Sequence, residues 1–228
     1  MTMAHLLDRP IWTSLLSRHA ALAEGGALAK RYPADMSAFA AAGDETAESI
    51  AALGELAQPG GTLLLVQKEA PVLPAGFAAE VQATLVQMVA DGPVTFADDE
   101  RIRPLGRGDA ADMLELAQLT KPGPFSLRAQ DFGPFWGIRE NGRLIAMAGQ
   151  RMGQDGFREL SGVCTHPDAQ GRGLGRLMSL YGARRIQEAG DIAYLHAYAT
   201  NTPAIRLYES IGFRLRETMN MAIIRREG

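Results

Sequence analysis

The sequence predicts an α/β protein, in the α+β sense, that is built from two parts. Helical and strand-like spacings of apolar residues alternate along the chain, which predicts both element types in one fold. Asn141-Gly142 lies between two apolar runs and is a strong signal for a β-hairpin, so part of the sheet is antiparallel. The net charge is -8 over residues 1–100 and +5 over residues 101–228. We therefore expect an N-terminal α/β domain over 1–100 and a second domain over 101–228.

The composition favours a folded protein without metal or disulfide. Of 228 residues, 46% are hydrophobic and 21% are charged, which supplies a core and argues against disorder. A lone cysteine, Cys164, forms no internal disulfide, and no Cys/His cluster has zinc-site spacing, so no metal is expected. No apolar run reaches the roughly 18 residues of a membrane span, and no signal-peptide pattern is visible at the N-terminus. We expect a cytoplasmic protein without a membrane partner.

In the first part, apolar spacing predicts two helices and two strands. The helices are expected over 12–22 and 45–56, and the strands over 62–66 and 85–89. Pro59-Gly60-Gly61 separates the second helix from the first strand. The acidic stretch at 98–100 is expected to be a linker.

The second part predicts the order strand, helix, three strands, helix, strand, helix, strand. Glycine, proline and capping residues bound these elements. Strands are expected over 102–104, 135–139, 144–150, 157–165 and 192–199, with one or two final strands over 213–225. Helices are expected over 110–119, 173–189 and from Asn201 to Gly212.

A glycine-rich loop joins the expected strand 157–165 to the helix after it. N–H groups in the first turn of a helix lack intrahelical acceptors, and the helix dipole adds partial positive charge there. Gly171, Gly173 and Gly175 carry no side chains, so an anion can approach the backbone closely. Arg172 and Arg176 add positive charge. The loop fits an anion site, and the alternative is a tight strand-to-helix connection.

Two nucleotide-binding motifs do not fit this loop. A Walker A loop needs Gly-Lys-Ser/Thr after a four-residue gap, and no lysine or hydroxyl follows here. A Rossmann fingerprint needs G-x-G-x-x-G, whereas the loop reads G-x-G-x-G. The arginines of the second part are scattered among acids, so nucleic acid is not an expected partner either.

Two ordered motifs carry a resemblance to a known family. Gln170-Gly171-Arg172-Gly173-Leu174-Gly175 resembles the Q/R-x-x-G-x-G/A motif of the GNAT superfamily of acyl-CoA-dependent N-acyltransferases. Downstream, Asn201-x-x-Ala204-x-x-Leu207-Tyr208-x-x-x-Gly212-Phe213 is similar to a second segment of that family. The similarity covers about residues 101–228, and residues 160–167 resemble in particular the glycine N-acyltransferase-like branch. It implies the GNAT fold, a mixed and mostly antiparallel sheet flanked by helices.

The resemblance also implies which residues bind acetyl-CoA or another acyl-CoA. Gln170 opens the loop, and main-chain groups of Val163 and Thr165 face the pantetheine arm. Asn201 contacts the pantetheine region or holds the turn before its helix. The pyrophosphate is expected at the loop itself, on the backbone of Gly171, Arg172, Gly173, Leu174 and Gly175, with the side chains of Arg172 and Arg176 beside it.

Two residues are candidates for catalysis. The resemblance implies that the Tyr208 hydroxyl protonates the departing thiolate; the alternative is a core aromatic, since Tyr208 lies on an apolar helix stripe. Glu159 lies six residues before Thr165, an even spacing that predicts a shared strand face. Some family members carry a base there, and the alternative is a solvated or salt-bridged acid. His196 fits a proton relay or a structural role, and Cys164 is expected in the core.

The activity implied is that of an N-acyltransferase, specifically an N-acetyltransferase using direct transfer from acetyl-CoA to a primary amine. The acceptor is expected to be a small-molecule amine or a protein N-terminus, and the oligomeric state is open. The alternatives are a non-catalytic acyl-CoA-binding regulatory module that engages a protein partner, and a structural protein. Residues 1–100 are expected to be a degenerate copy of the same fold or an unrelated cap.

Overall fold

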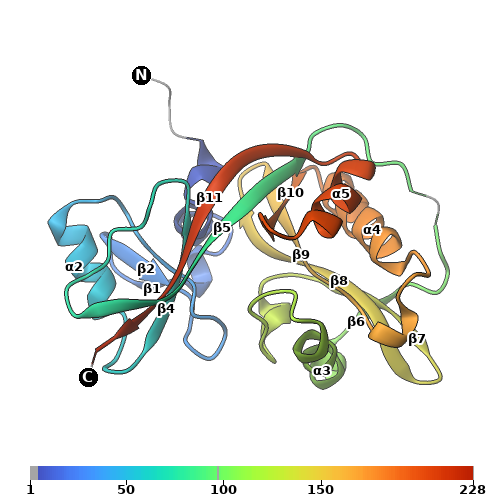
Figure 1. Cartoon of the computed structure of the whole chain (residues 1–228), viewed down its shortest axis with the longest axis horizontal. Helices are drawn as coiled ribbons and strands as arrows, with labels where there is room; N and C mark the ends of the chain where they lie inside the picture. The colour runs from blue at the N-terminus through green and yellow to red at the C-terminus, as the bar shows by residue number, and fades with distance from the viewer. Residues whose placement is uncertain (1–4, 97, 228) are drawn as a thin grey trace. The chain divides into compact units, whose positions relative to one another are not determined.

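The computed structural model describes residues 5–96 and 98–227 and divides into two compact units (Figure 1). Unit 1 takes in the chain up to Gln87, the stretch Met152–Asp155 and the chain from Glu217 onward. Unit 2 consists of Met88–Arg151 and Gly156–Arg216. The long strands β5 (Phe77–Ala90) and β11 (Arg214–Arg226) contribute residues to both units. The compact units therefore do not follow a single cut at residue 100.

Pairing between distant strands explains this difference. In unit 1, β11 runs antiparallel to β4 (Thr62–Gln67), from Asn220 opposite Gln67 to Arg225 opposite Thr62. The end of the chain is thereby returned to the first unit. A change in charge along the sequence carries no information about such a long-range pairing.

Unit 1 contains two helices, a small sheet and three neighbouring strands of the larger sheet, in the order β4-β11-β5. Pro10 begins α1 (Pro10–Leu16), and the Thr46 hydroxyl caps α2 (Ala47–Glu55) by accepting from the Ser49 N–H group. The core packs α2 against β4 and β11. The small sheet consists of β1 (Glu24–Gly25), β2 (Ala29–Arg31) and β3 (Ala40–Ala42). Two short 3-10 segments, Leu6–Asp8 and Ala20–Leu22, also belong to this unit.

Three expectations for this unit need correction. The helix expected over 12–22 ends at Leu16, because the chain turns at Ser17 before the 3-10 segment. The strands β1 to β3 were not expected, since two or three residues show no periodicity. The strand expected over 85–89 is only the end of β5, whose earlier residues are mostly exposed and lack an apolar run.

In unit 2 the sheet order is β5-β10-β9-β8-β7-β6, with β5 contributing its end from Met88. Neighbouring pairs β6/β7 and β7/β8 are antiparallel, whereas β9/β10 are parallel. Positive φ angles at Asn141 (48°) and Gly142 (80°) confirm the predicted hairpin. The strands are β6 (Arg103–Leu105), β7 (Phe135–Glu140), β8 (Arg143–Gln154), β9 (Phe157–Thr165) and β10 (Ile192–Tyr198).

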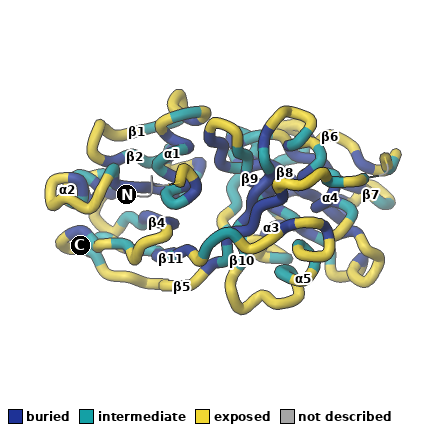
Figure 2. Tube along the Cα trace, turned by 90° about the horizontal axis from the view of Figure 1, so that it is seen from above, coloured by how far each residue is buried: buried dark blue, intermediate teal, exposed yellow. Residues whose placement is uncertain are grey.

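Three helices flank this sheet, which confirms the mixed, mainly antiparallel α/β fold. They are α3 (Ala110–Thr120), α4 (Leu174–Glu188) and α5 (Thr202–Ser210). α3 packs Met113 and Leu116 onto a cluster that includes Phe135 and Cys164. Figure 2 shows buried residues gathered along β8 and β9, in the middle of this sheet. None of the helices formed by the described residues is long and apolar enough to cross a membrane.

The pairing of β7 with β8 contains a close approach. Gly149 lies opposite Phe135, and a Cβ atom at Gly149 would overlap the aromatic ring of Phe135. That ring packs edge to face with Phe125, at 5.6 Å between centroids, and belongs to the core under α3. It therefore has little freedom to move away.

We predict that Gly149→Ala destabilises the protein by about 1–3 kcal/mol, the usual cost of overpacking a core. Gly92→Ala is the matched control, because a Cβ there meets nothing within 4 Å. Denaturant unfolding followed by circular dichroism measures both free energies of unfolding. Equal values for Gly149→Ala and Gly92→Ala would contradict the assigned packing.

Candidate functional site

The glycine loop leads from β9 through the 3-10 turn Pro167–Ala169 into α4. Gly171 (φ 75°) and Gly173 (φ 74°) are both in the left-handed region that favours glycine, and Gly173 is the N-cap of α4. The N–H group of Leu177 donates to the Gly173 carbonyl at 3.0 Å and starts the helical ladder. The N–H groups of the three residues between them have no acceptor within the helix.

The space in front of this loop is open. A Cβ atom added at Gly171 or Gly173 would meet no described atom within 4 Å. At Gly175, by contrast, it would lie 3.6 Å from the Thr165 hydroxyl, so this glycine lies where α4 packs close to β9. The backbone donors at the start of α4, a helix of 15 residues, can thus be approached by an anion.

Charged pairs surround the loop. The Arg172 guanidinium donates two hydrogen bonds to the Glu140 carboxylate at the end of β7, one of them at 2.9 Å. These hydrogen bonds and the charge of Arg172 hold the pKa of Glu140 below its usual range. Arg143 lies 3.3 Å from Asp168, and Arg176 is exposed in the first turn of α4. The Arg172 guanidinium is thus paired with Glu140 in this structure.

Asn201 and Tyr208 lie on the second motif, at α5. The Asn201 side-chain oxygen accepts from the Ala204 N–H group at 3.3 Å and caps the helix. Of its two expected roles, the structure shows the one that holds the turn. The Tyr208 ring packs edge to face with Phe213 at 5.9 Å between centroids. Burial, with a smaller contribution from the nearby Cys164 thiol, raises the pKa of Tyr208 to about 12.

Strand β9 changes faces at Gly162, which corrects one expectation. A Cβ atom at Gly182 of α4 would lie 2.6 Å from Leu160, and one at Gly175 of the same helix lies near Thr165. Leu160 and Thr165 are five residues apart and yet both face α4. Gly162 has a φ of 61°, so an extra residue interrupts the alternation. The shared face expected for Glu159 and Thr165 from their even spacing is therefore wrong.

The other residues of this segment are placed as follows. Val163 and Thr165 are half-buried on β9, and Gln170 is extended before the loop. Cys164 packs in the core under α3, as expected, and burial raises the pKa of its thiol to about 12. A thiol that stays protonated is a poor nucleophile. His166 accepts from the Asp168 N–H group at 3.2 Å and caps the short turn.

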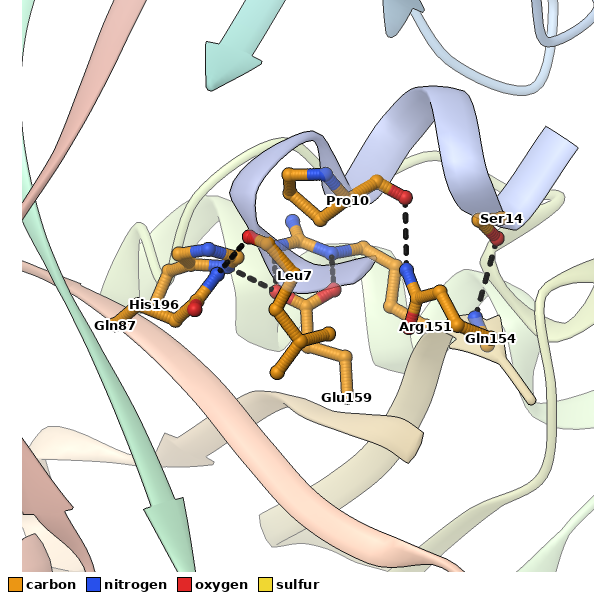
Figure 3. Close-up of polar contacts among 9 residues, drawn as sticks. Leu7, Pro10, Ser14, Gln87, Arg151, Gln154, Glu159 and His196 are labelled. Atoms are coloured by element: carbon orange, nitrogen blue, oxygen red, sulfur yellow. Dashed lines mark hydrogen bonds and ion pairs between the residues drawn. The ribbon is translucent and has the colours of Figure 1, made fainter. Parts of the chain in front are cut away.

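A buried charge cluster joins β8, β9 and β10 (Figure 3). Both Glu159 carboxylate oxygens accept from Arg151, from Nε and Nη2, at 2.7 Å each. The same Oε1 atom lies 2.8 Å from Nδ1 of His196. The Glu159 side chain is fully buried, and that of His196 is 4% exposed. Burial by itself raises the pKa of Glu159, but the charge of Arg151 and hydrogen bonds from Arg151 and His196 outweigh it and lower this pKa strongly.

Sequence reasoning named Glu159 and His196 but missed Arg151. A signal was present, since Arg151 is a charged residue shortly after the apolar run 144–149 of the same strand, and buried charges need partners. The partner lies eight residues away, across the β8–β9 turn. Within residues 5–96 and 98–227, no three His, Cys, Asp or Glu side chains are grouped to hold a metal ion.

A family model and curated relatives match this chain. The FR47-like protein family model matches residues 135–222. A mycothiol acetyltransferase of Nocardiopsis dassonvillei is 30% identical over 71% of this chain and 51% of its own length. One from Acidothermus cellulolyticus is 32% identical over 70% of this chain and 61% of its own. The chain thus spans between about half and two thirds of these relatives.

Two solved structures match nearly the whole chain. A structure from Kribbella flavida, described as a GCN5-related N-acetyltransferase, is 18% identical and shares the fold, with a TM-score of 0.65 over 96% of this chain and 95% of its own. A structure from Novosphingobium aromaticivorans, described as an acetyltransferase from the GNAT family, is 39% identical. It covers 99% of this chain and 100% of its own length, with a TM-score of 0.93. The chain belongs to the GNAT family.

Proposed function

We propose that the chain is an N-acetyltransferase that moves the acetyl group of acetyl-CoA onto a primary amine by direct attack. The observation that carries this proposal is the open row of N–H donors between Gly173 and Leu177. The pyrophosphate of acetyl-CoA binds these donors, with Arg172 and Arg176 beside it. The pantetheine arm runs along the main chain of Thr165 and Val163. The names of the matched relatives support the same reaction.

The chemistry needs a neutral amine, a stabilised oxyanion and a proton for the thiolate. A carbon–nitrogen bond forms as the carbon–sulfur bond breaks. Tyr208 suits the last step, because a hydroxyl whose pKa is about 12 is protonated at neutral pH. It donates its proton to the departing thiolate and regains one from solvent. Glu159 is the proposed base that removes the proton from the amine, directly or through a water molecule.

The acceptor is a primary amine on a small molecule or at a protein N-terminus. The net charge of -8 over residues 1–100 would favour a cationic amine by long-range attraction. The glycine N-acyltransferase-like branch, suggested by residues 160–167, remains a prediction. The same holds for residues 1–100 as a degenerate copy of the fold.

The test of function is release of CoA from acetyl-CoA in the presence of amines. The panel is an amino acid, a polyamine, an aminoglycoside and a peptide with a free N-terminus. We expect at least one of them to accelerate release, followed with a thiol reagent. A protein that binds acetyl-CoA and stays silent with every amine would favour the non-catalytic acyl-CoA-binding module.

We predict that Gly173→Glu weakens acetyl-CoA binding at least 100-fold, because it places bulk and negative charge at the pyrophosphate position. Gly190→Glu is the matched control: it introduces the same residue at a positive φ (86°) in open space beyond the other end of α4. Calorimetric titration should give micromolar binding, about -8 kcal/mol, for wild type and Gly190→Glu. Retained affinity in a folded Gly173→Glu variant would refute the loop as the cofactor site.

We predict that Tyr208→Phe lowers kcat by about 100-fold, within the usual range for general acid catalysis. Its Kd for acetyl-CoA should change less than about two-fold, since the ring and its contact with Phe213 are kept. Tyr181→Phe is the control: Tyr181 lies on α4, and its ring packs against Phe96 and Trp136. Steady-state rates with the best amine of the panel decide it. An unchanged kcat would remove Tyr208 from the mechanism.

A further inference from the structure

The two arginines at the glycine loop have different surroundings. Nη1 and Nη2 of Arg172 donate to the two carboxylate oxygens of Glu140, the last residue of β7, one of them at 2.9 Å. The exposed side chain of Arg176 has no hydrogen bond or ion pair with any residue that the structure describes. The charge of Arg172 is thus matched by an acid of the chain itself, whereas no described acid matches that of Arg176.

The pair of Arg172 with Glu140 can be opened easily. The two side chains are 43% and 40% exposed, respectively. Ion pairs at this level of exposure contribute little to stability, because water and salt screen the attraction. Another anion of suitable geometry can therefore take the place of Glu140 on Arg172.

A phosphate at the start of α4 would lie beside the same guanidinium. Arg172 stands between Gly171 and Gly173, where the space in front of the backbone is open to an anion. The planar guanidinium offers pairs of parallel N–H groups, and carboxylate and phosphate oxygens both fit such a pair. Glu140 engages the pair formed by Nη1 and Nη2. A phosphate can use these two donors only when Glu140 releases them.

Glu140 carries its negative charge at neutral pH. The hydrogen bonds and the charge of Arg172 hold its pKa below the usual range, and the charges of Arg101 and Arg143 contribute to this shift. Arg101 and Arg143 are each paired with another acid, Asp99 and Asp168. The Glu140 carboxylate therefore occupies Arg172 and also places a negative charge next to the loop.

We propose that Glu140 is an intramolecular competitor of the cofactor, whose pyrophosphate must displace the Glu140 carboxylate to bind the Arg172 guanidinium. This inference rests on the proposed acetyltransferase function and concerns the strength of cofactor binding. Acetyl-CoA and the product CoA carry the same pyrophosphate, so Glu140 weakens the binding of both. Release of the product limits turnover in many enzymes, and a weaker hold on CoA favours that release.

The first experiment measures the Kd of acetyl-CoA and of CoA by calorimetry for the full chain and for Glu140→Gln. We expect both ligands to bind about 3- to 10-fold more tightly to Glu140→Gln, since the Arg172 donors are free and one like charge is removed. Glutamine keeps the size of the side chain. A Glu140→Gln variant that binds both ligands as wild type does, or more weakly, would overturn the proposal.

Glu188→Gln is the matched control. Glu188 is also an exposed acid paired with arginines, Arg184 and Arg185, and it is the last residue of α4. A helix of 15 residues is about 20 Å long, well beyond the roughly 8 Å over which charges act at physiological salt. We therefore expect the Kd values of Glu188→Gln to equal those of wild type.

A double-mutant cycle separates competition for Arg172 from a general effect of charge. Glu140→Gln is combined with Arg172→Gln in one cycle and with Arg176→Gln in another. We expect the gain in affinity to disappear in the Arg172→Gln background and to persist in the Arg176→Gln background, because only Arg172 contacts Glu140. A gain of the same size in the Arg172→Gln background would show that Glu140 acts through its charge alone, and would overturn the competition.

A second measurement follows the Glu140 carboxyl directly. Carbon-13 NMR gives the pKa of this group, and its signal is assigned by its loss in Glu140→Gln. Saturating CoA should raise the pKa of Glu140, because the cofactor takes Arg172 away and adds negative charge nearby. Arg172→Gln should raise this pKa without any ligand. An unchanged pKa in the presence of saturating CoA would overturn the proposal.

The outcomes for the two proposals are distinct. None of these measurements uses an acceptor amine. A protein that binds CoA as expected but transfers no acetyl group would contradict the proposed function alone. An active enzyme in which Glu140→Gln leaves both Kd values unchanged would contradict the competition alone.

Discussion

The left-handed backbone at Gly171 and Gly173 is the constraint on which the site depends. It lets the chain leave β9, turn within a few residues and enter α4 with its first N–H groups exposed. A side chain at either position would carry a steric cost in that conformation. Because this turn fixes where α4 starts, it also brings Gly175 against Thr165 and lines the rest of the helix along β9. The exposed N–H donors at the start of α4 are thus a consequence of how the strand and helix are joined.

The second constraint is the buried charge of Glu159. Removing a carboxylate from water is costly, and the pairing with Arg151 offsets this cost only when both hydrogen bonds are well aligned. The cluster therefore holds β8, β9 and β10 in one arrangement and sets the His196 ring at the end of the paired strands. Neighbouring Leu160 faces the α4 side of the sheet, where the glycine loop begins. Glu159 and the glycine loop thus lie toward opposite faces of β9.

The fold is shared with the GNAT family. The two residues that we propose for proton transfer differ in how their pKa values are set. The pKa of Tyr208 is raised, chiefly by desolvation, and its ring packs against Phe213. Glu159 loses its proton because its partners outweigh its burial. Two groups with pKa values displaced in opposite directions are suited to different steps of one transfer.

The sequence by itself determined the local structure of the backbone. The bounds of β9, the Asn141-Gly142 hairpin, the Asn201 cap and the glycine loop all follow from φ preferences, capping and short-range periodicity. Only the tertiary structure decided the pairing of β11 with β4, the contact of Arg151 with Glu159 and His196, and the face that β9 presents on each side of Gly162. The physical reason is range. Pairings and buried charges depend on residues far apart in the chain, and one extra residue in a strand reverses every face that a period of two predicts.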